Sequence, residues 1–510
     1  MAKNIRQLEA KLWSAAESLR GNLSAEEYMH IVLGVLSLKY ISDKYNTAIK
    51  KIREDNLDPD IIDSIDFYNE YGAFKVPKES SWDYIINYAN SEKIGEVMDK
   101  AFIKLENENK MLKNVFDKNY NRESIDQNKL GDVVKIFSEE DFSSEEDEDI
   151  VGRIYEYFLG HFFKDRGQKG GEFYTPTSIV ELMINILKPL RGKIYDPACG
   201  TGGILVQSKR YINQNKGNFN LITVYGQEYN NITWKLAKLN ILLHGFSLYD
   251  ANDRSTLGEM SADTFTNDLH SMQKFDYVLA NPPFNMKKWS QEDLIDDPRW
   301  KWGLPPKGNA NYAWLSHIVD KMSSTGRGAV ILANGSLSSS QKQEIEIRKK
   351  LIEDNKVDAI IQLPDKLFYT TGIPASIWFF NNKKVNNKVL MVSGSSLDGN
   401  MISKKLRELK DTEIKNIVKI FDMHEKGEDI DFPELAKTIT INELKENDYS
   451  FVPGRYISSS IDEIDIEATK DEIRTLGKEL SDLLSEFLNL TPKVEEAIEK
   501  AINFKKDDVQ

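Results

Sequence analysis

Apolar residues recur at helical spacing through the first part of the chain. Leu8, Leu12 and Leu19 fall on one face of a helix, and Ser24 with Glu27 forms the pattern of a capping box before the next apolar run. This part shows no alternation of strands and helices. The pattern therefore predicts an N-terminal helical domain over residues 1–149.

From Ile150 onward, short apolar runs of the strand type alternate with helical patterns. Such alternation is typical of a parallel sheet with helices on both of its faces. We expect a doubly wound, Rossmann-like α/β domain over residues 150–384. Its strands are expected near residues 193–196, 221–228, 275–280, 328–334, 357–363 and 376–380.

After Lys384 the pattern weakens, and residues 385–510 form a third, C-terminal region with one expected strand at 388–392. Near the end of the chain, apolar residues alternate at spacings of three and four, which is a heptad seam. Two interpretations remain open: a helix packed on its own domain, or a coiled-coil dock for another chain. The seam consists of Ile473, Leu476, Leu480, Leu483, Phe487 and Leu490.

An acidic run separates the first two domains, at residues 139–141 and 145–149. It is typical of a solvated linker or the start of a helix, and the alternative is a surface that meets a basic partner.

Composition narrows the class of protein. The 510 residues carry a formal net charge of −14, which argues against a protein that wraps nucleic acid unaided. Either the substrate is not DNA, or a partner supplies most of the grip on DNA. No apolar run is long enough to span a membrane and the first residues lack the apolar core of a signal peptide, so we expect a cytoplasmic protein.

Cysteine and histidine usage excludes further kinds of site. Cys199 is the one cysteine of the chain, so an intramolecular disulfide or a thiolate metal cluster is excluded. The six histidines show no ligand spacing, and we predict no metal.

The expected strand at 275–280 runs directly into Asn281-Pro282-Pro283-Phe284. Prolines end the strand, and Asn281 is presented at its carboxyl end, where open α/β sheets bind ligands. The oxygen of the Asn281 side chain and the carbonyl of Pro282 can accept the two protons of one planar amine while Phe284 stacks on its ring. The alternative for this stretch alone is a tight turn with an asparagine cap.

A glycine-rich turn follows the first expected strand and leads into a helix. Its glycines permit a tight bend and close approach of a ligand, although it matches neither the dinucleotide fingerprint nor a phosphate loop. Glu228 ends the second expected strand, where a carboxylate can bind both hydroxyls of a ribose. The turn reads Asp196-Pro197-Ala198-Cys199-Gly200-Thr201-Gly202-Gly203.

A third stretch, Glu172-Phe173-Tyr174-Thr175-Pro176, precedes a helix that is expected to begin near Thr177. Hydroxyl groups and helix amides can bind an anionic group such as the carboxylate of an amino acid. Three sites at strand ends of one sheet can thus bind a carboxylate, a ribose and an amine, and S-adenosylmethionine is the cofactor that fits the first two.

These three motifs, in this order, resemble the gamma arrangement of adenine-specific DNA methyltransferases. The whole chain is similar to the modification subunit of type I restriction-modification systems, which also share the stretches Leu12-Trp13, Leu38-Lys39-Tyr40-Ile41-Ser42-Asp43 and residues 448–456. The resemblance implies an S-adenosylmethionine-dependent methyltransferase core with a helical N-terminal domain and a helical C-terminal tail. It also implies transfer of a methyl group to the N6 amine of adenine in DNA.

Carried over to this sequence, the resemblance makes Asn281, Pro282, Pro283 and Phe284 the clamp for a flipped adenine. Asp253 is the candidate for binding the adenine of the cofactor, although residues 252–257 lack the usual glycine. Cys199 is interpreted as a packing residue. The cofactor-binding candidates are Glu172, Phe173, Tyr174, Thr175, Pro176, Asp196, Ala198, Gly200, Thr201, Gly202, Gly203, Glu228 and Asp253.

The expected partners are double-stranded DNA with a flipped adenine, a separate DNA-specificity subunit, a second copy of this subunit and a restriction subunit. A separate specificity subunit is expected because the part after the core is short and helical. The segment 287–311, basic and rich in tryptophan, is either a DNA contact or an ordinary structured loop. Two other functions stay open: methylation of a protein glutamine or an RNA base, and a non-catalytic, cofactor-sensing scaffold.

Overall fold

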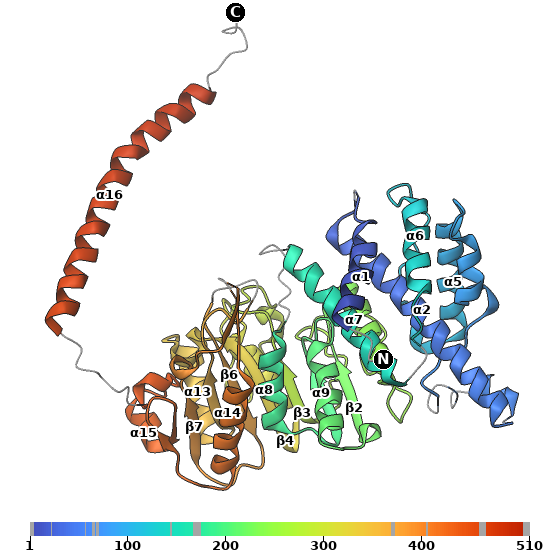
Figure 1. Ribbon diagram of the computed structural model, residues 1–510. Helices are drawn as coiled ribbons and strands as arrows, with labels where there is room; N and C mark the ends of the chain where they lie inside the picture. The colour runs from blue at the N-terminus through green and yellow to red at the C-terminus, as the bar shows by residue number, and fades with distance from the viewer. Residues whose placement is uncertain are drawn as a thin grey trace, which may run out of the picture. The chain divides into compact units, whose positions relative to one another are not determined.

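The computed structural model describes residues 5–21, 23–56, 58–63, 67, 71–142, 145–166, 175–368, 373–403, 406–457 and 466–502. The chain forms two compact units, Met1–Ser458 and Ser459–Gln510 (Figure 1). The first unit holds the N-terminal helices and a mixed sheet, and the second is a single long helix.

The N-terminal part is helical, as the apolar spacing predicts. The predicted capping box is present, since the Ser24 backbone N–H donates to the Glu27 carboxylate at 3.0 Å and the Glu27 N–H donates to the Ser24 hydroxyl at 3.3 Å. The middle of the long second helix is buried on all sides because α4, α6, α7 and α10 (Asn231–Leu243) all pack against it. The longer helices are α1 (Ile5–Glu17), α2 (Ala25–Glu54), α5 (Ile94–Glu108), α6 (Gln127–Ser138) and α7 (Glu145–Arg166), with shorter turns at η1 (Pro59–Asp63), η2 (Lys78–Ser80), α4 (Trp82–Ile85), η3 (Ile86–Tyr88) and η4 (Lys110–Leu112).

The sheet has nine described strands in the order β10-β11-β7-β5-β6-β4-β3-β1-β2. Strands β2, β1, β3 and β4 are parallel neighbours, so their carboxyl ends meet at one edge. Strand β6 lies antiparallel between β4 and β5. The strands are β1 (Gly192–Asp196), β2 (Ile222–Gly226), β3 (Phe275–Ala280), β4 (Met322–Ala333), β5 (Val357–Gln362), β6 (Ala375–Asn381), β7 (Lys388–Val392), β10 (Asp431–Phe432) and β11 (Ala436–Thr440), and β8 (Asn400–Ser403) pairs with β9 (Leu406–Glu408) in a separate hairpin.

Helices cover both faces of the sheet (Figure 1). Alternate strand residues explain this, since Ala329 and Ile331 of β4 join one core cluster while Val330 joins the other. One face carries α8 (Thr177–Leu187), α9 (Gly203–Gln214), α10 (Asn231–Leu243) and α14 (Asp411–Glu425), and the other carries α11 (Asn311–Lys321) and α13 (Lys342–Glu353). Short elements complete the unit: η6 (Phe219–Leu221), η7 (Gln291–Leu294), α12 (Gly335–Ser338), η8 (Gly394–Ser396), α15 (Ile441–Glu446) and η9 (Pro453–Arg455).

The predicted fold class, a Rossmann-like α/β core between helical ends, is confirmed. The antiparallel β6 was not expected, because its buried apolar run reads the same in either direction. The expected boundary at residue 384 falls between β6 and β7, which belong to the same sheet. The C-terminal region thus contributes β7, β10 and β11 to this sheet.

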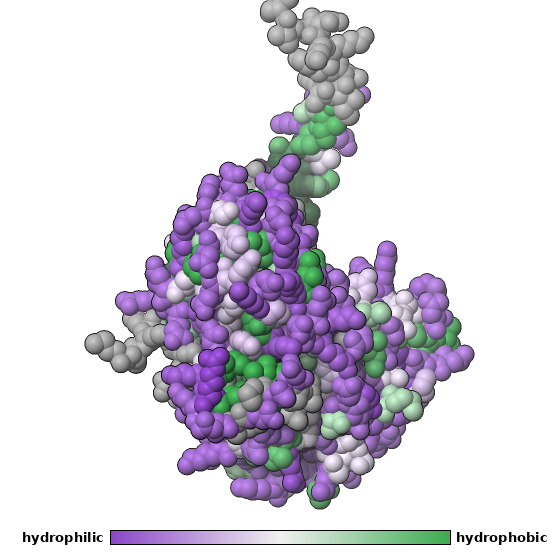
Figure 2. Space-filling view, turned by 90° about the vertical axis from the view of Figure 1, so that its right-hand side faces the viewer, coloured by the Kyte–Doolittle hydropathy of each residue, from purple (hydrophilic) through white to green (hydrophobic). Residues whose placement is uncertain are grey.

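The second unit is α16 (Ile466–Ile502). Its heptad residues are exposed, with Phe487 at 66%. By contrast, the face of the first unit that Figure 2 presents is mostly hydrophilic, with its hydrophobic residues in small, separate patches. The acidic residues 145–149 begin α7, as one of the two interpretations of that run expects.

Candidate active site

The Asn-Pro-Pro-Phe turn lies where the sequence predicts, directly after β3. Asn281 is buried, and its side-chain Nδ2 donates a hydrogen bond of 2.9 Å to the hydroxyl of Thr175. Because the N–H side of the amide is fixed in this way, the oxygen must face elsewhere. That oxygen, Oδ1, is buried and has no hydrogen-bond donor among the described residues. This buried hydrogen-bond acceptor is therefore not satisfied by the described part of the protein.

The residues after the turn are held by a network of amides. Phe284 is half-buried, with its ring edge-on to Phe368 at 5.9 Å. Asn285 has a left-handed backbone (φ 54°), and its N–H donates to the Asn311 side-chain oxygen at 3.0 Å. The Asn311 side-chain nitrogen donates back to Asn285 Oδ1 at 2.9 Å. Sequence analysis missed this pair because 26 residues separate its members.

The glycine turn joins β1 to α9 and is held by the carboxylate of Glu228. The Glu228 Oε2 accepts the N–H of Gly200 at 3.0 Å, and Oε1 accepts the N–H of Asn230 at 2.8 Å. Gly200 and Gly202 have φ values of 54° and 81°, which favour glycine. A Cβ atom added at Gly200 would meet no atom within 4 Å, so the backbone here faces open space. Glu228 therefore fixes the turn, and its carboxylate lies at the wall of the larger cavity.

Asp196 ends β1 beneath this turn and is almost fully buried. Its Oδ1 accepts the N–H of Ala198 at 2.9 Å. Burial, reinforced by the charge of Glu228, raises the pKa of Asp196 to about 8. Burial also raises the pKa of the Cys199 thiol, which therefore stays protonated, in agreement with a packing role.

Two adjoining cavities open around these residues. The smaller one, about 40 Å³, is lined by Thr175, Asp196, Gly203 and the α7 residue Glu156. The larger one, about 580 Å³, is lined by Glu228, Pro283 and Trp314. The two cavities share Ala198, Gly200, Thr201 and Asn281. The structure thus brings the Asn281 turn, the glycine turn and Thr175 of the third motif together around two cavities that share a wall.

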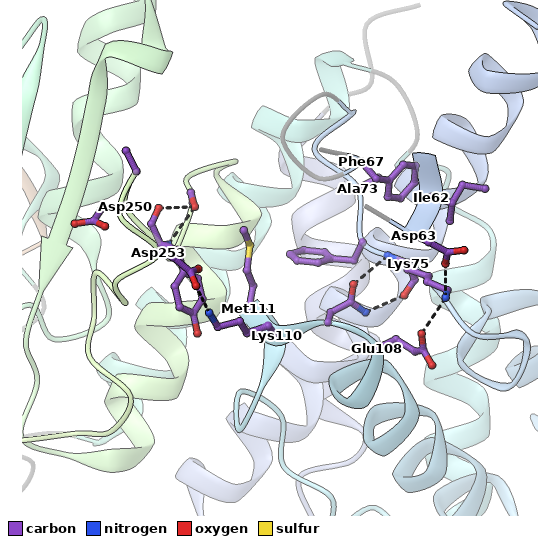
Figure 3. A pocket seen from close by; sticks show the side chains of 15 residues that line it. Ile62, Asp63, Phe67, Ala73, Lys75, Glu108, Lys110, Met111, Asp250 and Asp253 are labelled. Carbon is purple, nitrogen blue, oxygen red and sulfur yellow. Dashed lines mark hydrogen bonds and ion pairs between the residues drawn. The ribbon is translucent and has the colours of Figure 1, made fainter. Parts of the chain in front are cut away.

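Asp253 lies elsewhere. It is exposed and pairs with Lys110 of η4 at 2.8 Å, at a third cavity lined by residues of the N-terminal helices and of the segment 247–253. Figure 3 shows Asp253 pointing toward Lys110, with Lys75, Asp63 and Glu108 on the opposite side of that cavity. The larger cavity beside Glu228 is instead lined by Asp263 and Phe265. Sequence analysis passed over these two residues because they follow the non-matching stretch 252–257.

The remaining candidate residues lie at different places. Thr175 lines the smaller cavity, while Pro176, at the start of α8, lines a separate small cavity with Tyr157 and Leu367. Pro282 is buried within the turn. Glu172, Phe173 and Tyr174 lie outside the described residues.

The segment 287–311 is an ordered loop with a packed interior. Trp289, Trp300 and Arg299 are buried, and the two indole rings lie 5.6 Å apart. These tryptophans pack with one another and with Phe265, which supports the structured-loop interpretation for them. Lys287 and Lys288 remain exposed, and Lys288 lines the larger cavity.

The donor set fits the predicted ligand, a purine nucleoside that carries an amino acid. A carboxylate at a strand end, glycines with open space above them and a paired hydroxyl meet the needs of a ribose and an amino-acid end. Among the described residues, no group of three or more His, Cys, Asp or Glu side chains is placed to hold a metal ion. The same described residues include no helix both long and apolar enough to cross a membrane.

Comparison with known proteins covers nearly the whole chain. The sequence model of the N-6 DNA methylase family matches residues 146–464, and that of the HsdM N-terminal domain matches residues 8–137. The methylase subunit of the type I restriction enzyme MjaIX from Methanocaldococcus jannaschii is 34% identical over 97% of this chain and 91% of its own length. That of HindI from Haemophilus influenzae is 39% identical over 73% of this chain and 84% of its own length.

A solved structure agrees with the sequence comparison. The methyltransferase subunit of a type I restriction-modification system from Streptococcus thermophilus superposes with a TM-score of 0.75 at 26% identity. The superposition covers 89% of this chain and all of that one.

Proposed function

Because this chain belongs to the N-6 DNA methylase family, among the methylase subunits of type I restriction enzymes, we propose that its Asn281 turn is where the methyl group is transferred. The activity is methylation of the N6 amine of adenine in DNA with S-adenosylmethionine. The roles of individual residues and the identity of the partner subunits are what the proposal adds.

The unpartnered Oδ1 of Asn281 carries the proposal. It accepts a hydrogen bond from one N–H of the exocyclic amine of adenine, and the carbonyl of Pro282 accepts a hydrogen bond from the other. These two hydrogen bonds localise the nitrogen lone pair, which is otherwise delocalised into the ring. The amine nitrogen attacks the methyl group, S-adenosylhomocysteine leaves, and one N–H proton is then lost to solvent. Phe284 stacks on the extruded base. Bound S-adenosylmethionine supplies an electrophilic methyl group at this place, and the turn orients the amine toward it.

The two cavities divide the cofactor between them. Glu228 takes the ribose hydroxyls, and Asp196, Ala198, Gly200, Thr201 and Gly203 border the methionine end. Gly202 shapes the same turn through its left-handed backbone. Thr175, which also holds Asn281, borders the smaller cavity on the carboxylate side of the cofactor. By the resemblance, Glu172, Phe173, Tyr174 and Pro176 are assigned to the same end of the cofactor. Glu156, at the smaller cavity, is suited to the ammonium group. For the adenine of the cofactor, Asp263 and Phe265 replace Asp253, because they border the cavity of Glu228.

The test is transfer of labelled methyl from S-adenosylmethionine to cognate DNA by the wild type and by Asn281→Ala, assembled with the native partner subunits. The label should appear on adenine N6, and Asn281→Ala should lose transfer by at least about a hundredfold, as expected when a group acting in the transition state is removed. Cofactor affinity should stay within about threefold, because Asn281 holds the base and not the cofactor. Wild-type activity in Asn281→Ala would contradict the proposed role of Asn281 in binding the target amine.

The assembly follows from the charge and the last helix. We place the DNA-specificity subunit on the heptad seam of α16, since the chain has a net charge of −14 and the apolar residues of the seam are exposed, with Phe487 at 66%. A second copy of this subunit and a restriction subunit complete the complex, and the protein acts in the cytoplasm on double-stranded DNA.

Leu480→Glu with Leu483→Glu tests this docking, because two charges on the seam oppose apolar packing. Ser485→Glu is the matched control, since it adds a charge outside the seam of the same helix. Copurification of the specificity subunit should be lost with the double variant and retained with the control. Equal copurification of both would move the docking site away from α16.

A further inference from the structure

Arg299 is a buried cation whose donors are all in use. It is 7% exposed, and five hydrogen bonds leave its guanidinium group. The Nε and one Nη2 proton bind Asp297 at 2.8 and 2.6 Å, which compensates the charge. A guanidinium group has five N–H donors, so none is left for another ligand. Arg299 therefore positions the groups that it binds, and its charge is not available to a ligand.

Two of the five bonds hold one short loop by its backbone. The Nη1 donates to the carbonyl of Thr264 at 2.9 Å, and Nη2 donates to the carbonyl of Phe265 at 2.5 Å. This loop forms one wall of the larger cavity, together with Asp263. The hydroxyl of Thr264 also donates to the carbonyl of Pro197 in the glycine turn. The position of the wall thus depends directly on Arg299.

The fifth bond fixes the direction of the guanidinium group. His317 of α11 is fully buried, and burial together with the charge of Arg299 lowers its pKa well below the usual value. His317 is therefore neutral at neutral pH, and its Nδ1 accepts from Arg299 Nη1 at 3.1 Å. Burial alone would raise the pKa of Asp297, yet the hydrogen bonds from Arg299 hold it below its usual value. Asp297 and His317 together orient Arg299 from two sides.

Arg299 also belongs to the segment that follows the Asn-Pro-Pro-Phe turn. At its beginning, the carbonyl of Met286 accepts the N–H of Ala310 at 2.9 Å, so both ends of the segment are tied to the turn. Between these ends, Lys288 and Ser290 line the same cavity as the loop of Thr264. Arg299 is thus the link between two cavity walls, one beside the cofactor and one beside the target base.

We propose that Arg299 is a positioning residue that holds the cofactor-side wall, Asp263 to Phe265, against the segment that carries the target-base turn. The inference rests on the proposed cofactor site. It predicts that cofactor binding and the order of the segment 287–311 are coupled, since the two walls share one guanidinium group.

The experiment compares Arg299→Lys with the wild type as full chains. Lysine keeps the charge but offers three donors from one nitrogen, so it cannot reproduce the planar set of five hydrogen bonds that joins the loop carbonyls, Asp297 and His317. The dissociation constant for S-adenosylhomocysteine should rise by about tenfold or more, the size expected for the loss of charge-assisted bonds that order the wall. In the assembled complex, KM for S-adenosylmethionine should rise similarly, while kcat at saturation stays within about threefold.

Arg348→Lys is the matched control. Arg348 is 2% exposed and donates to the Tyr312 hydroxyl and the Ser339 carbonyl, away from both cavity walls. This variant should lose a similar amount of thermal stability but keep its cofactor affinity within about twofold. Equal affinity losses in both variants would mean that Arg299 is only a packing residue, and an unchanged affinity in Arg299→Lys would overturn the inference.

Amide hydrogen exchange of the protein without cofactor tests the tether, by which we mean the hold of Arg299 on the cavity wall. Arg299→Lys should speed exchange of the amides of residues 263–266 and of 287–300, while Arg348→Lys should not. If the wild type fails to bind cofactor, the proposed site is wrong, and this measurement still decides whether Arg299 holds the wall. Asp297→Asn, which loosens Arg299 without removing it, should shift exchange and affinity in the same direction by smaller factors. Unchanged exchange in both variants would overturn the tether.

Discussion

The side-chain amide of Asn281 donates a hydrogen bond of 2.9 Å to the hydroxyl of Thr175, a residue 106 positions earlier in the chain. This contact decides which end of the amide faces the cavity. An asparagine side chain can present either an N–H donor or an oxygen acceptor, and only the acceptor can bind an amine that has two protons to give. Thr175, two residues before α8, therefore ensures that Asn281 presents a hydrogen-bond acceptor to the target amine.

Replacing Thr175 by valine should lower kcat measured at saturating S-adenosylmethionine. Valine keeps the volume but removes the acceptor, so the amide of Asn281 is free to turn. A neutral hydrogen bond of about 1 kcal/mol corresponds to a drop in kcat of about fivefold to tenfold. Methyl-transfer kinetics on cognate DNA check this. Thr175→Ser retains the hydroxyl and should behave like the wild type; if valine also did, Thr175 would have no orienting role.

Gly200→Ala should abolish tight cofactor binding. The added Cβ projects into the open space above the turn. The left-handed backbone at this position (φ 54°) is in addition disfavoured for alanine. Gly427→Ala is a matched control, since Gly427 has a φ of 84° and equally open surroundings but ends α14, outside the two cavities.

Both glycine variants should lose about 1 kcal/mol of folding stability. Gly200→Ala alone should weaken binding of S-adenosylhomocysteine by about tenfold or more, as overpacking at a ligand contact costs at least about 1.4 kcal/mol. Calorimetric titration and thermal melts separate the two effects. Equal affinities in the two variants would show that the open space at Gly200 is not used by the ligand.

The buried Asp196 should make folding stability depend on pH. Its pKa is raised by burial to about 8, whereas in the unfolded chain it is near about 4. Between these values the folded state binds more protons than the unfolded state, so the free energy of unfolding falls as pH rises through this window. The contribution is at most about 1.4 kcal/mol per pH unit.

Asp196→Asn replaces the carboxyl group with a neutral one of the same shape and retains an acceptor for the Ala198 N–H. The stability difference between this variant and the wild type should therefore grow from pH 5 to pH 8, in favour of the variant, by more than about 1 kcal/mol. Urea unfolding at several pH values, without cofactor, measures it. A difference that stays constant with pH would contradict a protonated Asp196.

Alanine at Asp263 and at Asp253 should separate the two candidates for the adenine of the cofactor. Asp263 borders the cavity of Glu228, and its Oδ1 also accepts the N–H of Phe265 at 2.7 Å. Asp263→Ala should therefore raise KM for S-adenosylmethionine by about tenfold, the cost of about 1.4 kcal/mol of binding. Asp253→Ala breaks only the exposed pair with Lys110 and should leave KM within about twofold. If Asp253→Ala raised KM and Asp263→Ala did not, Asp253 would again be the candidate for binding the adenine of the cofactor.

Much of the fold was readable from local pattern. Strand β3 has the expected bounds, and the capping box of Ser24 begins α2 as predicted, because both depend on neighbouring residues. The direction of β6 was not readable. Direction depends on which strands flank it, and a buried apolar run carries no mark of direction.

For the site, the sequence by itself determined the chemistry that each motif offers: an amide with an aromatic ring after a strand, glycines at a bend and a carboxylate at the next strand end. Local backbone preferences fix these features. Only the tertiary structure decided which groups act together. The pairing of Asn281 with Thr175, the choice of Asp263 beside Glu228, and the hold of Arg299 on Thr264 and Phe265 all join residues distant in sequence. Such contacts arise from packing of whole elements, so no local pattern encodes them.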